Sequence, residues 1–347
     1  MSPDAKPRDD GQDMEDDGQD MEDDGQDMED DGQDMEDDGQ DMEKGMVAAS
    51  LRGTKISSTF PRLVSVVIPA RNAAAVIAGQ FEGLSRQEYR GAWELIVADN
   101  ASTDDTAAVA ADWAVKLPEL RVVLAAARRG INHARNVGAA AARGDFLVFC
   151  DADDVATAGW LHAMVEAARS ADIVGGHLDH VALNTARVRC WRSSLLPDRL
   201  PSVFGFLPYA VGASLGVRTA VFQRLSGFNE DYANGGDDIE FCWRAQLASY
   251  TLGHAPAAVM CYRLRDRLWP LAKQGYGYGR SDAHLYRDFR PHGLPPLPAG
   301  AGLRSWGQLI RRLPELASHD RVGAWVYDAA WRYGRLMGSL RYRVLCP

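Results

Sequence analysis

The segment Phe146-Leu-Val-Phe-Cys150, followed directly by Asp151-Ala-Asp-Asp154, decides the fold of this chain. A run of five apolar residues is typical of a strand that is buried on both faces of a parallel sheet. The carboxylates come at the carboxyl end of this strand, the edge at which open α/β sheets bind their ligands. Crowded carboxylates repel unless a cation lies between them, and Mg²⁺ and Mn²⁺ prefer oxygen ligands. The segment therefore predicts either a divalent-metal site that holds a diphosphate or an acidic helix N-terminus.

The rest of the first half alternates between β-branched apolar runs and stretches with helical spacing. Ser102 or Thr103 is the expected N-cap of the second helix, and Gly144 is the expected C-cap of the third. This alternation predicts an α/β fold, in which a mostly parallel sheet carries helices on both faces. We expect strands at 63–68, 93–98, 120–124, 146–150 and 172–178, and helices at 73–85, 103–116, 133–143 and 218–225.

Polar side chains follow each of the first four predicted strands. Because the carboxyl ends of parallel strands meet at one edge, we expect these loops to converge. Acids that accept from ribose hydroxyls, arginines that bind phosphates and a metal cluster together suit a nucleoside diphosphate. Taken singly, Asp99 is explained as a turn former and Arg135 as a helix-surface residue. The residues in question are, strand by strand, Arg71 and Asn72; Asp99, Ser102 and Asp104; Arg128, Arg129 and Arg135; and Asp151, Asp153 and Asp154.

Segments Val64–Asn72, Ala98–Thr106, Gly130–Gly138 and Asp151–Asp153 resemble, in order and spacing, the motifs of family 2 glycosyltransferases. The resemblance covers roughly residues 62–265 and implies a GT-A fold, which is a Rossmann-like α/β fold. It also implies transfer of a sugar from a nucleotide-diphosphate donor to an acceptor hydroxyl, with inversion and with help from Mg²⁺ or Mn²⁺. On this basis residues 62–154 form the nucleotide-sugar half of the domain and residues 155–265 the acceptor half.

The resemblance implies roles for individual residues as well. Asp151 and Asp153 are expected to bind the metal, with Asp153 as the more direct ligand. Asp238 matches the general base of inverting members. The nucleotide would be bound by Pro69, Arg71, Asp99, Arg135 and Asp151.

The loop at 227–236 leads to the two acids Asp237 and Asp238, which begin a predicted helix. Plain N-capping by Asp237 is the alternative to a catalytic role at this helix start. Crowding by neighbouring acids would raise the proton affinity of Asp238, whereas a helix N-terminus would lower it. Glu240 and Arg244 lie four residues apart, so we expect them to form a structural ion pair.

Three positions depart from the pattern of the family. Ser214 stands where Asn is frequent, Asp237 where Glu is frequent, and Tyr262 where many members have a His that completes the metal shell. Two explanations of the missing His stay open. Either Arg263 helps to neutralise the diphosphate, or water takes the vacant metal position, as Mg²⁺ readily allows.

Residues 266–347 form a basic, aromatic-rich C-terminal extension. Within it, tyrosines alternate with glycines at 273–280, which indicates either an acceptor sugar stacked on Tyr276 or Tyr278, or a flexible loop. Tryptophans and arginines are mixed at 303–345, which suits an amphipathic helix on an anionic membrane. A helical hairpin packed on the catalytic domain explains the same composition, and we slightly favour it.

The N-terminal end is strongly acidic: residues 9–43 are five copies of Asp-Asp-Gly-Gln-Asp-Met-Glu. One Met per copy cannot bury enough surface to offset chain entropy, so residues 1–45 are predicted to be disordered. Residues 44–347 hold 36 basic and 27 acidic side chains, so the net charge of −10 comes from the repeats. We interpret the repeats as a tandem expansion without a catalytic role; the alternatives are a Ca²⁺ loop and a tail that folds back on the basic C-terminal end. Whether translation starts at Met1 or Met46 stays open.

The remaining features bear on location and partners. The odd number of cysteines, five, without CxxC or metal spacing indicates reduced thiols and a cytoplasmic protein, with membrane contact at the inner face as an open alternative. We expect no signal peptide, no membrane span and no nucleic-acid partner. A glycan or lipid-linked acceptor for cell-envelope polysaccharide is expected. The rival functions are a non-catalytic nucleotide-binding scaffold and, ranked lower, a nucleotidyltransferase, which would want a Gly- and Lys-rich phosphate loop.

Overall fold

The described part of the chain is built on an eight-stranded mixed sheet, in the order β3-β2-β1-β4-β7-β6-β8-β5. The computed structural model describes residues 60–117, 119–233, 235–298 and 300–346, so the acidic repeats and Met46 lie outside the described residues. The strands are β1 (Leu63–Ala70), β2 (Ala92–Asp99), β3 (Leu120–Leu124), β4 (Phe146–Phe149), β5 (Val155–Ala156), β6 (Ile173–Asp179), β7 (Leu215–Arg218) and β8 (Leu252–Cys261).

Helices cover both faces of this sheet, which confirms the predicted α/β architecture. None of the helices in the described part of the chain is both long and apolar enough to cross a membrane. The helices are α2 (Ile77–Ser85), α3 (Thr106–Trp113), α4 (Ile131–Ala141), α5 (Trp160–Ala167), α6 (Ala186–Arg189), α7 (Thr219–Arg224), α8 (Asp237–Leu247), α9 (Leu268–Phe289), α10 (Ala301–Arg311) and α11 (Val322–Arg341), with 3₁₀ turns at Gly212–Ser214, Arg290–His292 and Leu313–Ala317.

Strand β4 shows why the sheet is buried on both sides. Phe146 and Val148 point into one hydrophobic cluster, which α2, α3 and α5 complete, whereas Leu147 and Phe149 point into a second cluster with α7 and α8. Successive side chains of a strand point to opposite faces, so an unbroken apolar run is what a doubly covered strand requires. All four side chains are fully buried.

Parallel pairing along β3-β2-β1-β4 brings the predicted polar loops to one edge. Ala70 of β1 is level with Asp99 of β2, and Asp99 is level with Leu124 of β3. On the other side of β1, Val67 is level with Phe149, which ends β4. The loops after these strands therefore start side by side, as the sequence predicts.

The two loops after β1 and β2 are joined by hydrogen bonds, and these bonds overturn the predicted start of the second helix. Ser102 is not an N-cap, because its Oγ donates to Asp99 and accepts from the Asn72 N–H at 3.0 Å. Thr103 N donates to Asn72 Oδ1 at 2.8 Å. Helix α3 therefore begins only at Thr106, with Asp105 at the N-cap position.

Gly144 does not cap a helix either. Helix α4 ends at Ala141, and Ala142 is already extended. The Gly144 N–H donates to Ser65 Oγ at 2.9 Å, and a Cβ at this position would lie 2.6 Å from the Leu63 carbonyl oxygen. Glycine is needed here because the chain passes very close to β1.

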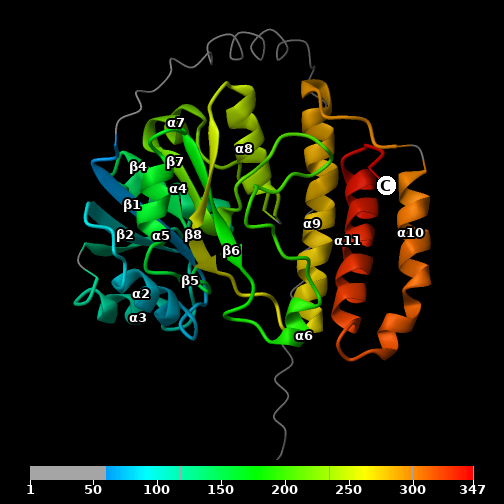
Figure 1. The fold of residues 1–347 in the computed structure, drawn as a ribbon, viewed down its shortest axis with the longest axis horizontal. Coiled ribbons are helices and arrows are strands. Elements are labelled where there is room, and N and C mark those ends of the chain that lie inside the picture. The colour runs from blue at the N-terminus through cyan, green and yellow to red at the C-terminus, as the bar shows by residue number, and fades with distance from the viewer. Residues whose placement is uncertain (1–59, 118, 234, 299, 347) are drawn as a thin grey trace, which may run out of the picture. The chain divides into compact units, whose positions relative to one another are not determined.

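The segment at 273–280, predicted to be an acceptor-binding stretch or a loop, lies inside helix α9. Its glycines let α11 approach closely: a Cβ on Gly275 would lie 2.7 Å from the Tyr327 carbonyl oxygen, and one on Gly279 would lie 1.9 Å from that of Trp331. On α11, a Cβ on Gly334 would lie 2.1 Å from the carbonyl oxygen of Tyr276. Small residues thus allow two helices to pack at backbone distance, and the expected C-terminal helices are present (Figure 1).

We predict that Gly279→Ala lowers the free energy of unfolding by about 1–3 kcal/mol, because the new methyl group collides with the backbone of α11. The matched control is Gly307→Ala in α10, where a Cβ meets nothing within 4 Å. Alanine in that open helical position should stabilise the protein by up to about 1 kcal/mol. Urea unfolding of both variants checks this. Equal effects of the two substitutions would contradict the close packing of α9 on α11.

Candidate active site

Two adjoining cavities lie at the carboxyl edge of the parallel strands. The first has a volume of about 610 Å³, and the residues at the ends of β1 and β4 line it. The second has a volume of about 430 Å³ and is lined by the start of α8 together with α9 and α11. Asp151 and Arg265 line both cavities, so the two spaces meet at these side chains.

The first cavity contains most of the residues that were predicted to bind a nucleotide or a metal. Pro69, Arg71, Asp151 and Asp153 all line it. Arg265, which the sequence did not single out, also lines it and binds Asp153 Oδ2 at 2.9 Å through Nη1. Arginines and carboxylates therefore line the same space, which is large enough for a charged ligand.

Arg263 extends this cationic side of the first cavity. Its Nε donates to the Asp153 carbonyl oxygen at 2.8 Å, and its backbone N–H donates to Asp154 Oδ1 at 2.8 Å. Asp154 is fully buried, and its Oδ2 has no hydrogen-bond partner among the described residues. Burial, and then the charge of Asp151, raise the pKa of Asp154 well above its usual range.

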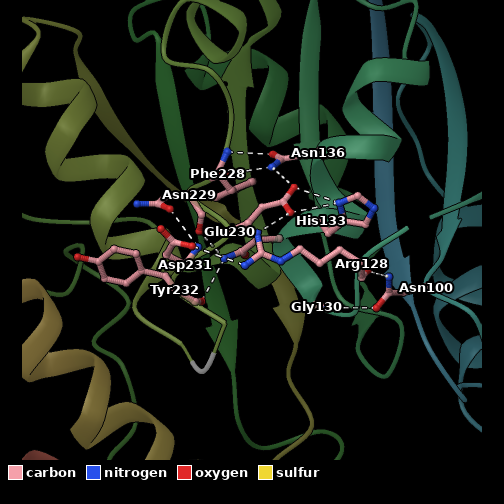
Figure 2. A network of polar contacts seen from close by, with 11 residues as sticks. Asn100, Arg128, Gly130, His133, Asn136, Phe228, Asn229, Glu230, Asp231 and Tyr232 are labelled. Atoms are coloured by element: carbon pink, nitrogen blue, oxygen red, sulfur yellow. Dashed lines mark hydrogen bonds and ion pairs between the residues drawn. The ribbon is translucent and has the colours of Figure 1, made fainter. Parts of the chain in front are cut away.

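Asp99 does not line either cavity. It is buried, and its Oδ1 accepts from the backbone N–H of Ser102 at 3.2 Å as well as from the Ser102 hydroxyl. The next residue, Asn100, reaches the first cavity instead. Its Oδ1 accepts from the Gly130 N–H at 2.9 Å, and its Nδ2 donates to the Arg128 carbonyl oxygen at 2.8 Å (Figure 2).

Arg135 lies in the second cavity, not in the first where nucleotide contact was expected. Its side chain is 4% exposed, and the guanidinium joins two acids: Nη2 binds Asp151 Oδ1 at 3.0 Å, and Nη1 binds Asp237 Oδ2 at 2.7 Å. A Cβ on Gly212 would lie 2.8 Å from Arg135 Nη2, so only glycine leaves room for this arginine. Arg135 therefore connects the end of β4 with the start of α8.

Helix α8 starts after Gly235 and Gly236, whose φ angles of 108° and 75° favour glycine. Asp237 makes no N-capping hydrogen bond, because its carboxylate is held by Arg135. Asp238 lines the second cavity, and its Oδ2 accepts from the Gly212 N–H at 2.9 Å. The alternative of plain capping by Asp237 is therefore wrong.

Burial is the main cause of the raised pKa of both acids. It raises the pKa of Asp237 to about 7, although the nearby Arg135 charge acts in the opposite direction. It also raises the pKa of Asp238, against the hydrogen bond from Gly212. The sequence left the direction for Asp238 open, between crowding by neighbouring acids and the helix N-terminus, and did not reveal that burial is the largest cause. A carboxylate with raised proton affinity is a better base near neutral pH.

The loop before α8 is held to α4 by polar contacts that sequence patterns do not reveal. Glu230 accepts from Asn136 Nδ2 at 3.2 Å and lies 3.1 Å from His133 Nδ1 (Figure 2). Asn136 also exchanges two hydrogen bonds of 2.9 Å with the Phe228 backbone. The predicted ion pair between Glu240 and Arg244 is present at 2.6 Å and stiffens α8. These contacts therefore hold the start of α8, with Asp237 and Asp238, in a fixed position.

The second cavity is rich in aromatic side chains, and the C-terminal helices supply much of its wall. Tyr278 of α9 lines it, whereas Tyr276 packs against Tyr333 with the ring centroids 5.8 Å apart. Of the two tyrosines considered for sugar stacking, only Tyr278 is therefore in position. The other aromatic side chains of the lining are Tyr209, Tyr262, Tyr327 and Trp331.

The described residues contain no group of three His, Cys, Asp or Glu side chains arranged for a metal ion. They do offer two carboxylates, Asp151 and Asp153, on one wall of the first cavity. Each uses one oxygen for an arginine, and the other oxygen accepts no hydrogen bond from the described residues. Mg²⁺ is commonly held by one or two carboxylates together with substrate phosphates, so this donor set fits such an ion.

Comparison with known proteins agrees with this geometry. Residues 65–225 match the family described as Glycosyl transferase family 2. Glycosyltransferase AglE of Haloferax volcanii is 26% identical over 307 residues, which cover 82% of this chain and 99% of that protein. The pre-mycofactocin glycosyltransferase of Mycobacterium tuberculosis is 28% identical over 266 residues, or 71% of this chain, which spans about half (52%) of that relative's length.

A solved structure shows the same fold. Mannosyltransferase PcManGT from Pyrobaculum calidifontis, in complex with GDP-Man and Mn²⁺, superposes with a TM-score of 0.55 and 21% identity. The match covers 85% of this chain and 94% of that one, so the predicted GT-A fold is confirmed. With the match over residues 65–225 and these curated relatives, the chain carries a glycosyl transferase family 2 domain and is a glycosyltransferase.

Proposed function

We propose that this enzyme binds a nucleotide-diphosphate sugar in the first cavity and transfers the sugar to an acceptor hydroxyl in the second. The observation that carries the proposal is the junction of the two cavities at Asp151 and Arg265. A diphosphate among the arginines of the first cavity would leave its sugar at this junction. Asp238 lines the second cavity, where it would face the acceptor. Transfer in a single displacement would invert the anomeric carbon.

Asp151 and Asp153 would hold Mg²⁺ or Mn²⁺ beside the diphosphate. A bound cation supplies charge neutralisation of the leaving nucleoside diphosphate. Arg265 binds Asp153 and lines the same cavity, and Arg263 lies next to it. These two arginines would share the neutralisation, which suits a chain with Tyr262 at the position where relatives of this family often have His. Pro69, Arg71 and Asn100 would contact the nucleotide. Asp99 would act indirectly, by holding the loop that contains Ser102.

Asp238 would act as the general base. A base must come within about 3 Å of the hydroxyl whose proton it takes. Oδ2 of Asp238 is held by the Gly212 N–H and Oδ1 by the Ile239 N–H, so the carboxylate has a fixed direction. Arg135 keeps the adjacent Asp237 paired, which leaves Asp238 as the acid of α8 that is available for proton transfer.

The C-terminal extension would also bring the enzyme to a lipid-linked or other envelope glycan at the inner face of the membrane. Helix α11 exposes Tyr333, Leu336 and Leu340 at helical spacing, and α10 exposes Leu303. Residues 262–347 carry 15 basic and six acidic side chains. An anionic lipid surface is the partner that matches exposed apolar side chains within a basic segment.

We expect one of UDP, GDP and TDP to bind the full chain with Mn²⁺, and Asp153→Ala to weaken that binding at least tenfold. The reason is the loss of one of two carboxylates that fit the cation. Calorimetry with and without Mn²⁺ measures this, with the exposed Asp112→Ala on α3 as control. If a folded protein bound none of the three nucleotides, the donor site would be misplaced; if binding ignored the metal, the arginines alone would carry the phosphate charge.

Asp238→Asn should lower sugar transfer by about 10²–10⁴-fold while nucleotide binding stays unchanged, because only proton removal is lost. Release of nucleoside diphosphate from the donor is the readout, and the exposed Asp320→Asn is the control. Since the carboxylate form is active and the pKa of Asp238 is raised, kcat/KM should fall as the pH drops through that pKa. Unchanged transfer by the Asn variant would refute the assignment.

For the membrane contact, we predict that the full chain sediments with phosphatidylglycerol vesicles and not with phosphatidylcholine vesicles. Binding should weaken with salt, since surface charges are screened. Leu336→Asp and Leu340→Asp should reduce the bound fraction severalfold. Val115→Asp, at a site that is 93% exposed outside the extension, is the matched control. Equal loss in the control, or no binding by the unaltered protein, would exclude this surface.

A further inference from the structure

Arg192 occupies an unusual place in the wall of the second cavity. It follows the short helix α6, and two C-terminal helices hold its guanidinium. Nη1 donates to Gln274 Oε1 of α9 at 2.9 Å. The guanidinium carbon lies 4.1 Å from the ring centroid of Tyr327 on α11 and 5.7 Å from that of Tyr278 on α9. The arginine is therefore stacked and oriented before any ligand arrives.

The charge of Arg192 is not matched by a carboxylate of the described residues. Arg135, Arg192 and Arg265 are the arginines that line this cavity. Arg135 pairs with two aspartates and Arg265 with Asp153. Within the described residues no carboxylate lies at ion-pair distance, 4.0 Å, from Arg192. Stacked tyrosines and a neutral amide attract a guanidinium, but they carry no negative charge. The positive charge of Arg192 is therefore left available to a ligand in the cavity.

We propose that Arg192 binds an anionic group, a carboxylate or a phosphate, on the acceptor substrate. This inference rests on the proposed function, because it takes the second cavity as the acceptor site. A guanidinium presents parallel N–H groups that match two oxygens of a carboxylate or phosphate. The stack with Tyr327 fixes the plane of that fork, so little side-chain freedom is left to lose on binding.

The donor diphosphate is a poorer partner for Arg192. Arg71, Arg263 and Arg265 line the first cavity, and Arg192 does not. The arrangement also orients the acceptor, since an anion would avoid Asp238 and lie at the arginine. Asp282 of α9 also lies in this wall. Burial raises its pKa to about 7, so it is partly neutral at physiological pH. The hydroxyl end of an anionic acceptor would thus face Asp238.

Two sources offer the same anion chemistry: the carboxylate of a uronic acid, and the phosphate that joins an acceptor sugar to a polyprenyl lipid. The probes are therefore glucuronate against glucose, and geranyl phosphate against geraniol. Calorimetric titration uses the full chain, in its unaltered form and as Arg192→Gln and Arg192→Lys. Arg187→Gln is the matched control, because Arg187 also stacks on an aromatic ring, Trp191 at 5.4 Å, but does not line the cavity.

We expect one anionic probe to bind at least tenfold more tightly than its neutral counterpart. This preference should disappear in Arg192→Gln, decrease severalfold in Arg192→Lys and persist in Arg187→Gln. The pair of probes that shows this preference identifies the source of the anion. Binding of the nucleotide with Mn²⁺ should be unchanged in Arg192→Gln, and thermal unfolding shows whether that variant folds; if it does not, the Lys variant decides.

Equal affinity for the charged and neutral probes, or a preference that survives in Arg192→Gln, would overturn the inference. A loss of nucleotide binding in a folded Arg192→Gln would also overturn it, because Arg192 would then belong to the donor site. Failure of the proposed function looks different: the unaltered protein would bind no nucleotide. The two outcomes are therefore distinguishable in one set of titrations.

Discussion

The buried guanidinium of Arg135, held between Asp151 and Asp237, is the interaction on which the site depends. Asp151 follows β4 and Asp237 opens α8, two elements almost ninety residues apart in sequence. Removing one partner of such a buried pair would leave an uncompensated charge, which costs about 3–5 kcal/mol. The bridge therefore fixes the position of the first cavity, which Asp153 lines, relative to the second, which Asp238 lines.

A second constraint comes from backbone packing rather than charge. Gly212 leaves room for Arg135, and the glycines of α9 and α11 bring the two helices to backbone contact. Because α9 and α11 are joined so closely, Tyr278 and Tyr327 have fixed positions in the second cavity. The C-terminal helices are thus part of the wall of the second cavity. Their two tasks, lining this wall and exposing apolar side chains on the outer surface, use different faces of the same helices.

The amino-acid sequence predicts the fold better than it predicts the site. Strands such as β1 and β4 are visible because an apolar run buried on both faces looks the same in any protein. Helix starts are missed where Ser102 and Asn72 bond across loops, since the partner comes from another part of the chain. The alternating tyrosines and glycines of α9 resemble a loop until α11 is placed beside them. Arg192 carries no sequence signal, because its proposed role depends on the lack of an ion-pair partner among the described residues, which only the folded chain reveals.

The same reasoning explains how so many acids can be gathered before any ligand binds. Asp151 and Asp153 are neutralised by Arg135 and Arg265, while Asp154, deprived of water and of a partner for Oδ2, holds its proton more strongly. The cluster is therefore compatible with folding in the absence of a cation, and its two paired carboxylates keep one oxygen each for a ligand. Preorganisation of this kind means that the charge of an incoming diphosphate meets arginines already in place, so little rearrangement has to accompany binding. Charge balance within the fold, rather than the acidic motif taken alone, makes this edge of the sheet suitable for a phosphorylated substrate.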